Sequence, residues 1–117
     1  MLKIEAIVRP ERIGHVTEAL IEAGCSGFHY QNVTGQGQQQ GVTVVTGRGA
    51  QVANRSAVPK TMLTTVVSDG MREKVIEAVV ASARTPGEGQ IGDGKIFVSN
   101  VDDVVRVRTG EKGENAI

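Results

Sequence analysis

The chain has 117 residues, with 13 Lys and Arg balanced by 13 Asp and Glu, three aromatic residues and one cysteine. This length favours a single domain that buries its core without disulfides or metals. Zero net charge and so few aromatic rings argue against binding to nucleic acid or to an anionic membrane. A lone cysteine cannot form an intramolecular disulfide, and the sequence has the pattern of neither a signal peptide nor a membrane span. We therefore expect a cytoplasmic protein.

The first third of the chain predicts a strand, a helix and a second strand. Apolar and charged residues alternate over 2–6, as in a strand with one buried face. Pro10 suits the first turn of a helix, whose apolar stripe runs over 13–23 and which Gly24 is placed to end. Residues 28–33 fit a second strand that ends near position 35.

The second half repeats this pattern. Residues 61–67 fit a third strand, and Ser68 or Asp69 is suited to cap the helix that follows. Apolar residues four apart over 71–83 give that helix one buried seam. Residues 95–101 fit a fourth strand, and 104–108 fit a short fifth.

The order of these elements predicts the fold. The arrangement β-α-β, long loop, β-α-β is that of an α+β protein, the ferredoxin-like split βαβ sandwich, with one domain over 1–117. Both helices would cover the same face of the sheet. The other face would need a partner, so we expect the chain to oligomerise.

The long loop between the second and third strands, about 36–59, has an unusual composition. It is rich in glutamine and glycine, lacks acidic residues, and carries only Arg48 and Arg55 as charges. Residues 43–46 could form a strand or hairpin within it. Loops this long are uncommon in compact domains and tend to be functional, although a flexible surface insertion is the alternative.

A glycine-rich segment precedes the fourth strand. Four glycines between Gly87 and Gly94 are followed by Lys95. Glycines let backbone N–H groups approach an anion and the lysine adds a charge, so the segment could cradle a phosphate; an ordinary turn is the alternative. It is not a Walker loop, because the spacing differs and a strand follows. Asp93 would hold the loop by accepting backbone N–H bonds, or meet a ribose hydroxyl.

Two arginines near the C-terminus strengthen the phosphate hypothesis. Arg106 and Arg108 are two residues apart, so on an extended strand they would lie on the same face. Both could then reach one polyanion.

The sequence offers no catalytic residues. The histidines, His15 and His29, belong to no metal-ligand spacing and to no nucleophile motif. A nucleotide hydrolase would need a positioned base, and neither His15 nor Glu88 has a clear place beside the phosphates. We therefore predict a binding protein, with a slow hydrolase as a weaker alternative.

Several segments together resemble one family. Residues 91–98 (IGDGKIFV) and 106–111 (RVRTGE), with 6–10 (AIVRP) and 35–41 (GQGQQQG), closely resemble the PII nitrogen-regulatory signal proteins. The resemblance implies a homotrimer that binds ATP or ADP in its subunit clefts, and 2-oxoglutarate beside MgATP. It also implies a long loop that docks onto an ammonium transporter or a nitrogen-assimilation enzyme such as glutamine synthetase, with no direct membrane insertion.

The resemblance also assigns individual residues. The nucleotide would contact His29, Gly35, Gly37, Gln38, Thr64, Val66, Gly92, Asp93, Gly94, Lys95, Arg106 and Arg108. The 2-oxoglutarate would contact Gln39, Lys60 and Gly92, with Gln39 also on magnesium. In Gly47-Arg48-Gly49-Ala50, Arg48 matches the loop tip that enters the transporter mouth.

Some positions depart from the family pattern. Gln38 stands where many members have arginine, Thr64 where an acidic residue is common, and His29 where threonine is found. The glycine-rich segment carries about three extra residues near 86–88, the long loop has about two, and it contains no tyrosine. These departures leave open a divergent sensor of another small anion, such as bicarbonate, or of another adenylate.

Overall fold

The computed structural model describes residues 1–25, 27–37, 44–46, 51–53 and 56–117. Its strands are β1 (Leu2–Val8), β2 (Phe28–Gly37), β3 (Val44–Thr46), β4 (Gln51–Ala53), β5 (Ser56–Val67) and β6 (Gly94–Asn100). Its α-helices are α1 (Ile13–Glu22) and α2 (Arg72–Ala83). Among the helices described, none is both long and apolar enough to cross a membrane.

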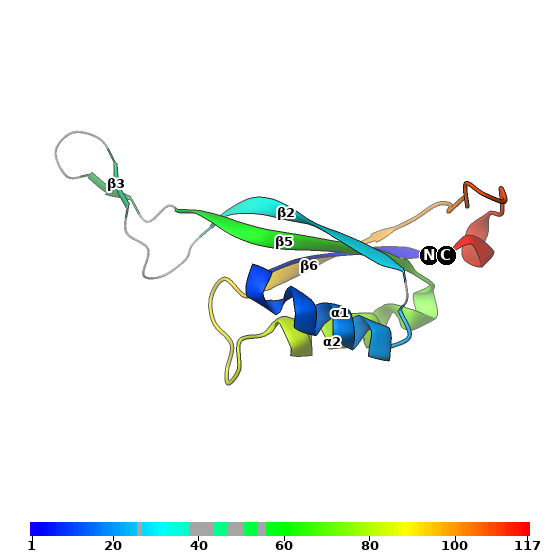
Figure 1. The fold of residues 1–117 in the computed structure, drawn as a ribbon, viewed down its shortest axis with the longest axis horizontal. Coiled ribbons are helices and arrows are strands. Elements are labelled where there is room, and N and C mark those ends of the chain that lie inside the picture. The colour runs from blue at the N-terminus through cyan, green and yellow to red at the C-terminus, as the bar shows by residue number, and fades with distance from the viewer. Residues whose placement is uncertain (26, 38–43, 47–50, 54–55) are drawn as a thin grey trace.

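Four strands form one antiparallel sheet in the order β2-β5-β1-β6. Helices α1 and α2 lie together on one side of this sheet (Figure 1). Each central strand has a neighbour from the other half of the chain, since Ala6 of β1 lies opposite Leu63 of β5 and Ile96 of β6. This arrangement confirms the predicted α+β, ferredoxin-like fold.

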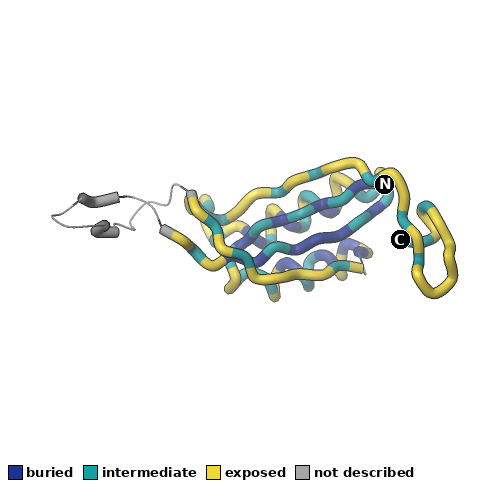
Figure 2. Tube along the Cα trace, turned by 90° about the horizontal axis from the view of Figure 1, so that it is seen from above, coloured by how far each residue is buried: buried dark blue, intermediate teal, exposed yellow. Residues whose placement is uncertain are grey.

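The core lies between the sheet and the helices. The even-numbered residues of β1 are buried, as the predicted alternation requires. Val16 and Leu20 of α1 and Val75 and Val79 of α2 pack in the same cluster. Figure 2 shows buried residues concentrated in the middle of the sheet and exposed residues along its outer strands. The hydrophobic effect therefore fixes which face of each strand meets the helices.

The opposite face of the sheet carries a mixed set of side chains. Glu5 of β1 lies between Thr64 of β5 and Phe97 of β6. Phe97 is half exposed. Within the described residues, both α-helices pack on the other face. This face is consequently available for contact with a second copy.

The helix ends differ in detail from the predictions. Residues 10–12 form a 3-10 turn before α1, and Gly24 ends α1 with a φ of +89°, as expected. Ser68 precedes a second 3-10 turn but makes no side-chain cap, so the predicted cap is wrong. The carboxylate of Asp69 instead accepts a hydrogen bond from the N-terminal ammonium of Met1 at 2.9 Å.

The strands that flank the long loop extend further than expected. Strand β2 runs to Gly37 and β5 begins at Ser56, and these two residues are paired. Residues 36–37 and 56–59 therefore belong to the sheet and not to the loop. Between them β3 and β4 pair with each other, which confirms the strand or hairpin predicted around 43–46.

The fifth strand predicted over 104–108 is wrong. In the described C-terminal residues 101–117, Val105 makes an isolated bridge with Lys112 and the chain turns back between them. The backbone N–H of Gly110, with a φ of +73°, donates to the carbonyl of Arg106 at 2.7 Å and closes this turn. The alternating residues 104–108 favour a strand, but the turn closed by Gly110 reverses the chain before a strand can form.

Candidate functional site

A pocket of about 500 Å³ lies at the end of the sheet where β1 stops. It is lined by Ile7, Gly35, Gln36, Val58, Lys60, Ile91, Gly92, Gly94, Lys95 and Phe97. Five of the residues predicted to bind ligand meet here: Gly35, Lys60, Gly92, Gly94 and Lys95. The long strands β2 and β5 bring the first two, and the glycine-rich segment brings the other three.

Gly94 is required for this geometry. It lies opposite Val8 at the start of β6, with a φ of +128°. A Cβ atom at this position would lie 1.8 Å from the carbonyl oxygen of Ile7. Only glycine allows the backbone to approach β1 so closely, and this approach places Lys95 at the pocket.

The carboxylate of Asp93 organises the glycine-rich segment. Its Oδ2 accepts the backbone N–H of Thr85 at 2.9 Å and that of Gln90 at 3.0 Å. Its Oδ1 accepts the Thr85 hydroxyl at 2.5 Å and Nε of Arg9 at 3.0 Å. This confirms the prediction that Asp93 holds the loop by accepting backbone N–H bonds. Burial alone would raise the pKa of Asp93, but these hydrogen bonds, led by Thr85, lower it well below its usual range.

Lys60 lies under the same segment. Its Nζ donates a hydrogen bond to the carbonyl of Gly92, and the residue is only 9% exposed. Burial, and then the charge of Arg9, lower the pKa of Lys60, while Glu11 and Asp93 act in the opposite direction. A cation that is partly desolvated beside another cation is stabilised by an arriving anion. The pocket is therefore suited to a negatively charged ligand.

The remaining predicted contacts lie elsewhere on the chain. Thr64 lies on β5 opposite His29, and Val66 lies opposite Lys3. Lys95 is opposite Ile7, which lies four residues from Lys3 on β1. At the usual rise of a strand, Lys95 and Val66 are therefore about 13 Å apart along the direction of β1. These residues do not line the 500 Å³ pocket.

The two C-terminal arginines lie beyond the opposite end of the sheet. The N–H of Val101 donates to the carbonyl of Met1, which therefore marks this end of the sheet. Met1 lies six residues before Ile7, the partner of Lys95, so this end is about 20 Å from Lys95. Figure 1 shows the C-terminal segment at that end, away from the glycine-rich loop. Arg106 donates to Glu111 at 3.2 Å and to the carbonyl of Asn115 at 3.1 Å, while Arg108 is exposed in the turn. One chain therefore does not bring Lys95 and the two arginines to the same phosphate.

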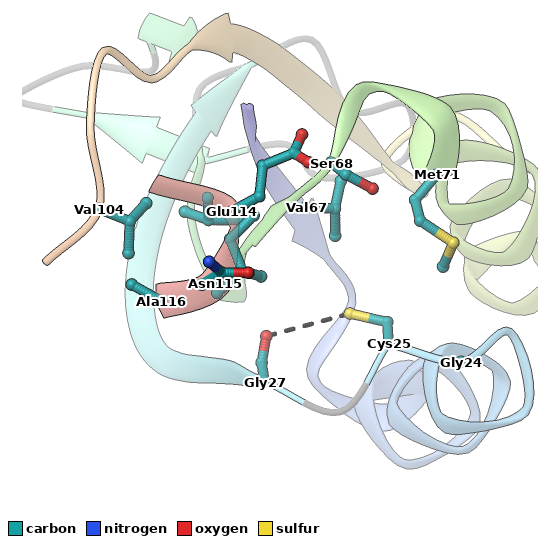
Figure 3. A pocket seen from close by; sticks show the side chains of 12 residues that line it. Gly24, Cys25, Gly27, Val67, Ser68, Met71, Val104, Glu114, Asn115 and Ala116 are labelled. Carbon is teal, nitrogen blue, oxygen red and sulfur yellow. Dashed lines mark hydrogen bonds between the residues drawn. The ribbon is translucent and has the colours of Figure 1, made fainter. Parts of the chain in front are cut away.

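A second pocket, of about 750 Å³, lies at this opposite end (Figure 3). It is bounded by the turn after α1, the end of β5 and the C-terminal residues 114–117. Of the predicted contacts it includes Val66. Cys25 is buried in its wall as a free thiol, with Sγ 3.2 Å from Oγ1 of Thr65.

Other predicted residues cannot be placed in either pocket. Gln38, Gln39 and Arg48 lie outside the described residues, and Gly37 ends β2 opposite Ser56. Among the residues that the structure describes, no group of three or more His, Cys, Asp or Glu could hold a metal ion.

Sequence reasoning missed Arg9 and Thr85. Arg9 reaches the loop from the end of β1, where it also donates from Nη2 to the carbonyl of Ile91 at 2.9 Å. Thr85 supplies two of the four hydrogen bonds to Asp93. Arg9 lies in the segment AIVRP, which indicates the family but not this contact, and no spacing signals the role of Thr85, because both contacts depend on the fold.

A sequence profile of the family described as Nitrogen regulatory protein P-II matches residues 1–111. The chain belongs to this family. It is 46% identical to P-II 2 of Methanothermobacter thermautotrophicus over 118 residues, covering all of this chain and 97% of that protein. It is 43% identical to the P-II protein of Cereibacter sphaeroides over the full length of both.

A solved structure extends the comparison to the fold. The crystal structure of Arabidopsis thaliana PII bound to citrate matches with a TM-score of 0.78 and 40% identity, covering 99% of this chain and 91% of that one. The P-II relatives are named as regulatory proteins and not as enzymes. These findings confirm the family and the fold that the sequence motifs indicated.

Proposed function

We propose that this chain is a non-enzymatic, cytoplasmic signal transduction protein that binds ATP or ADP between its subunits and regulates nitrogen metabolism. The observation that carries the proposal is the pocket at the end of β1, where glycine backbone and two lysines surround a space with an excess of positive charge. Backbone N–H groups beside Gly92 and Gly94, together with Lys60 and Lys95, suit the phosphates of a nucleotide.

The nucleotide site would be completed by a second copy of the chain. Lys95 lies at one end of the sheet, and Thr64, Val66, Arg106 and Arg108 lie towards or beyond the other. A symmetric pair of chains would join like ends, whereas a ring joins unlike ends at every interface. A head-to-tail ring, the homotrimer implied by the family, therefore places both halves of the site in each cleft.

A carboxylate effector would bind beside the phosphates. The Arabidopsis PII structure is described as bound to citrate, which supports binding of small carboxylates within this fold. In this chain Lys60 would pair with a carboxylate of 2-oxoglutarate near Gly92. The described residues offer no metal-ligand set and the carboxylate of Asp93 is fully engaged, so magnesium would arrive with the phosphates and be held by them and Gln39. When bound, the metal would draw phosphate and carboxylate oxygens together.

The citrate bound to the Arabidopsis protein also favours a second candidate function. A divergent PII-like sensor could use the same lysines for another small anion or another adenylate, and the residues at positions 29, 38 and 64 are consistent with that. Titration calorimetry with ATP, ADP and AMP, each with and without 2-oxoglutarate and with magnesium or a chelator, separates the two candidates. Binding of 2-oxoglutarate only in the presence of nucleotide and magnesium supports the first. Nucleotide turnover above about 1 per second would contradict both and indicate an enzyme.

Replacement of Lys95 tests the phosphate site directly. A hydrogen bond to a charged group contributes about 1.5–3 kcal/mol, so we expect Lys95→Ala to weaken nucleotide binding by about ten- to a hundredfold. Lys74→Ala, which removes an exposed lysine from α2, should leave the affinity unchanged. Equal affinity of Lys95→Ala and the unmodified protein would contradict the proposed site.

The long loop would carry the regulatory contact. Arg48 lies between two glycines in a segment without acidic residues, where a guanidinium could bind several carbonyl or carboxylate acceptors of an ammonium transporter. A central interface arginine commonly contributes 2 kcal/mol or more, so we expect Arg48→Ala to weaken partner binding by about thirtyfold. The measurement is a pull-down from native membranes in ADP and in MgATP with 2-oxoglutarate. Arg55→Ala is the matched control, and equal recovery of a transporter by Arg48→Ala and the unmodified protein would contradict the proposal.

A further inference from the structure

Arg9 joins the end of β1 to a segment more than 80 residues away. Its Nε donates to Oδ1 of Asp93 at 3.0 Å and its Nη2 donates to the carbonyl of Ile91 at 2.9 Å. The side chains of Arg9 and Asp93 are only 17% and 19% exposed. One guanidinium therefore fixes both a side chain and a backbone carbonyl of the glycine-rich segment, directly beside Gly92.

Thr85 closes the same segment from its other end. Its backbone N–H and its hydroxyl both donate to Asp93, eight residues later. The N–H of Gln90 adds a third contact from within the loop. Hydrogen bonds to the single carboxylate of Asp93 therefore join the two ends of the loop over 85–93.

The hydrogen-bonding capacity of Asp93 is used up by these contacts. A carboxylate offers about four acceptor positions, and Asp93 receives four donors from Arg9, Thr85 and Gln90. Its side chain is consequently committed to the loop and has no acceptor left for a ribose hydroxyl or a metal ion. The N–H of Asp93 already donates to the carbonyl of Gln90, so what the loop can present to a phosphate is the backbone of Gly92 and Gly94 and the side chain of Lys95.

We propose that Arg9 and Thr85 are positioning residues that hold the glycine-rich loop, through Asp93, in its nucleotide-binding shape before the nucleotide arrives. The inference rests on the proposed nucleotide-binding function and deepens it. Gly87, Gly89, Gly92 and Gly94 all have positive φ values, so the segment has wide conformational freedom without these contacts. A loop that is already ordered does not lose that freedom when the ligand binds, and affinity is correspondingly higher.

The test compares variants that remove the side-chain donors of one residue at a time. We expect Arg9→Gln and Thr85→Val each to weaken binding of ATP and ADP by about tenfold in calorimetry, the usual effect of losing a hydrogen bond to a charged group. Thr85→Ser keeps both donors and should bind nucleotide as the unmodified protein does. Arg9→Lys keeps the positive charge but loses the two-pronged guanidinium, so its affinity should lie between those of the unmodified protein and Arg9→Gln. Arg72→Gln, which breaks an exposed ion pair with Glu73, is the control and should have no effect.

Two further measurements separate positioning from general stability. In ligand-free Arg9→Gln, hydrogen exchange at the amides of Thr85 and Gln90 should accelerate while exchange in α1 and α2 stays unchanged. Arg9→Gln should also cost less affinity in an Asp93→Asn background than in the unmodified protein, because the two residues share one contact and only the hydrogen bond from Arg9 to the carbonyl of Ile91 is then left to lose.

The outcomes distinguish this inference from the function on which it rests. Absence of nucleotide binding by the unmodified protein would overturn the proposed function and this inference with it. Normal binding by the unmodified protein, Arg9→Gln and Thr85→Val alike would overturn the inference alone. Additive losses in Arg9→Gln with Asp93→Asn, or faster exchange throughout the core, would also overturn it.

Discussion

Replacement of Gly94 by alanine should weaken nucleotide binding by about a hundredfold or more and lower the thermal stability of the protein. The added Cβ would lie 1.8 Å from the carbonyl oxygen of Ile7, and that neighbour is backbone and cannot move aside alone. The start of β6 would have to separate from β1, which moves the backbone of Gly92 and Gly94 and the side chain of Lys95 away from the pocket. Loss of two hydrogen bonds to charged phosphate oxygens weakens binding by about a hundredfold or more.

The loss of stability has two physical sources. A φ of +128° is strained for alanine and the close contact adds overpacking, which together amount to about 3 kcal/mol. For a domain of this size we expect a fall in melting temperature of about 10 °C. The measurements are a thermal melt and a calorimetric titration with ATP.

Gly87→Ala is the matched control for Gly94→Ala. Gly87 also has a positive φ, of +93°, but an added Cβ would meet nothing within 4 Å. This variant carries the backbone strain, about 1–2 kcal/mol, without the clash, and should bind nucleotide nearly as well as the unmodified protein. Equal loss of binding in both variants would show that loop conformation, and not the approach of Gly94 to β1, controls the site.

The parts of the fold that follow from local patterns could be predicted from the sequence. Alternating residues of β1 are buried because period two places them on one face, and the seam of Val75, Val79 and Ala83 is buried because four residues complete about one helical turn. Gly24 ends α1 because it adopts a positive φ that other residues avoid. The hydrogen bonds of Asp93 to backbone N–H groups were also predictable, since an aspartate among glycines in a tight loop has few other partners nearby.

The parts that depend on distant contacts could not be predicted in this way. The pairing of Arg9 with Asp93 joins residues 84 apart in sequence, and only the sheet order places β1 beside β6. Arg106 and Arg108 alternate as if on a strand, but the turn closed by Gly110 competes successfully with strand extension. Their separation from Lys95 follows from the directions of β1 and β6, which motif spacing does not record.

The separation of Lys95 from Arg106 predicts that variants of these two residues complement each other in mixed complexes. If the site lies between copies, Lys95→Ala and Arg106→Ala each damage every site, because each removes one half of it. In complexes assembled from equal amounts of the two variants, however, some clefts receive Lys95 from one subunit and Arg106 from its neighbour. With random assembly into a ring, about one cleft in four should regain normal affinity. Titration calorimetry of the purified mixed complexes measures this fraction as the stoichiometry of tight binding.

A second mixture identifies the alternative arrangement. Unmodified protein assembled with a chain that carries both Lys95→Ala and Arg106→Ala should also yield about one intact cleft in four when each site spans two copies. If instead both residues served one site within a single chain, this mixture would retain about half of the sites and the mixture of single variants would retain none. The single-chain distance of about 20 Å along β1 argues for the first result, because neither a lysine nor an arginine side chain can extend so far to share a phosphate.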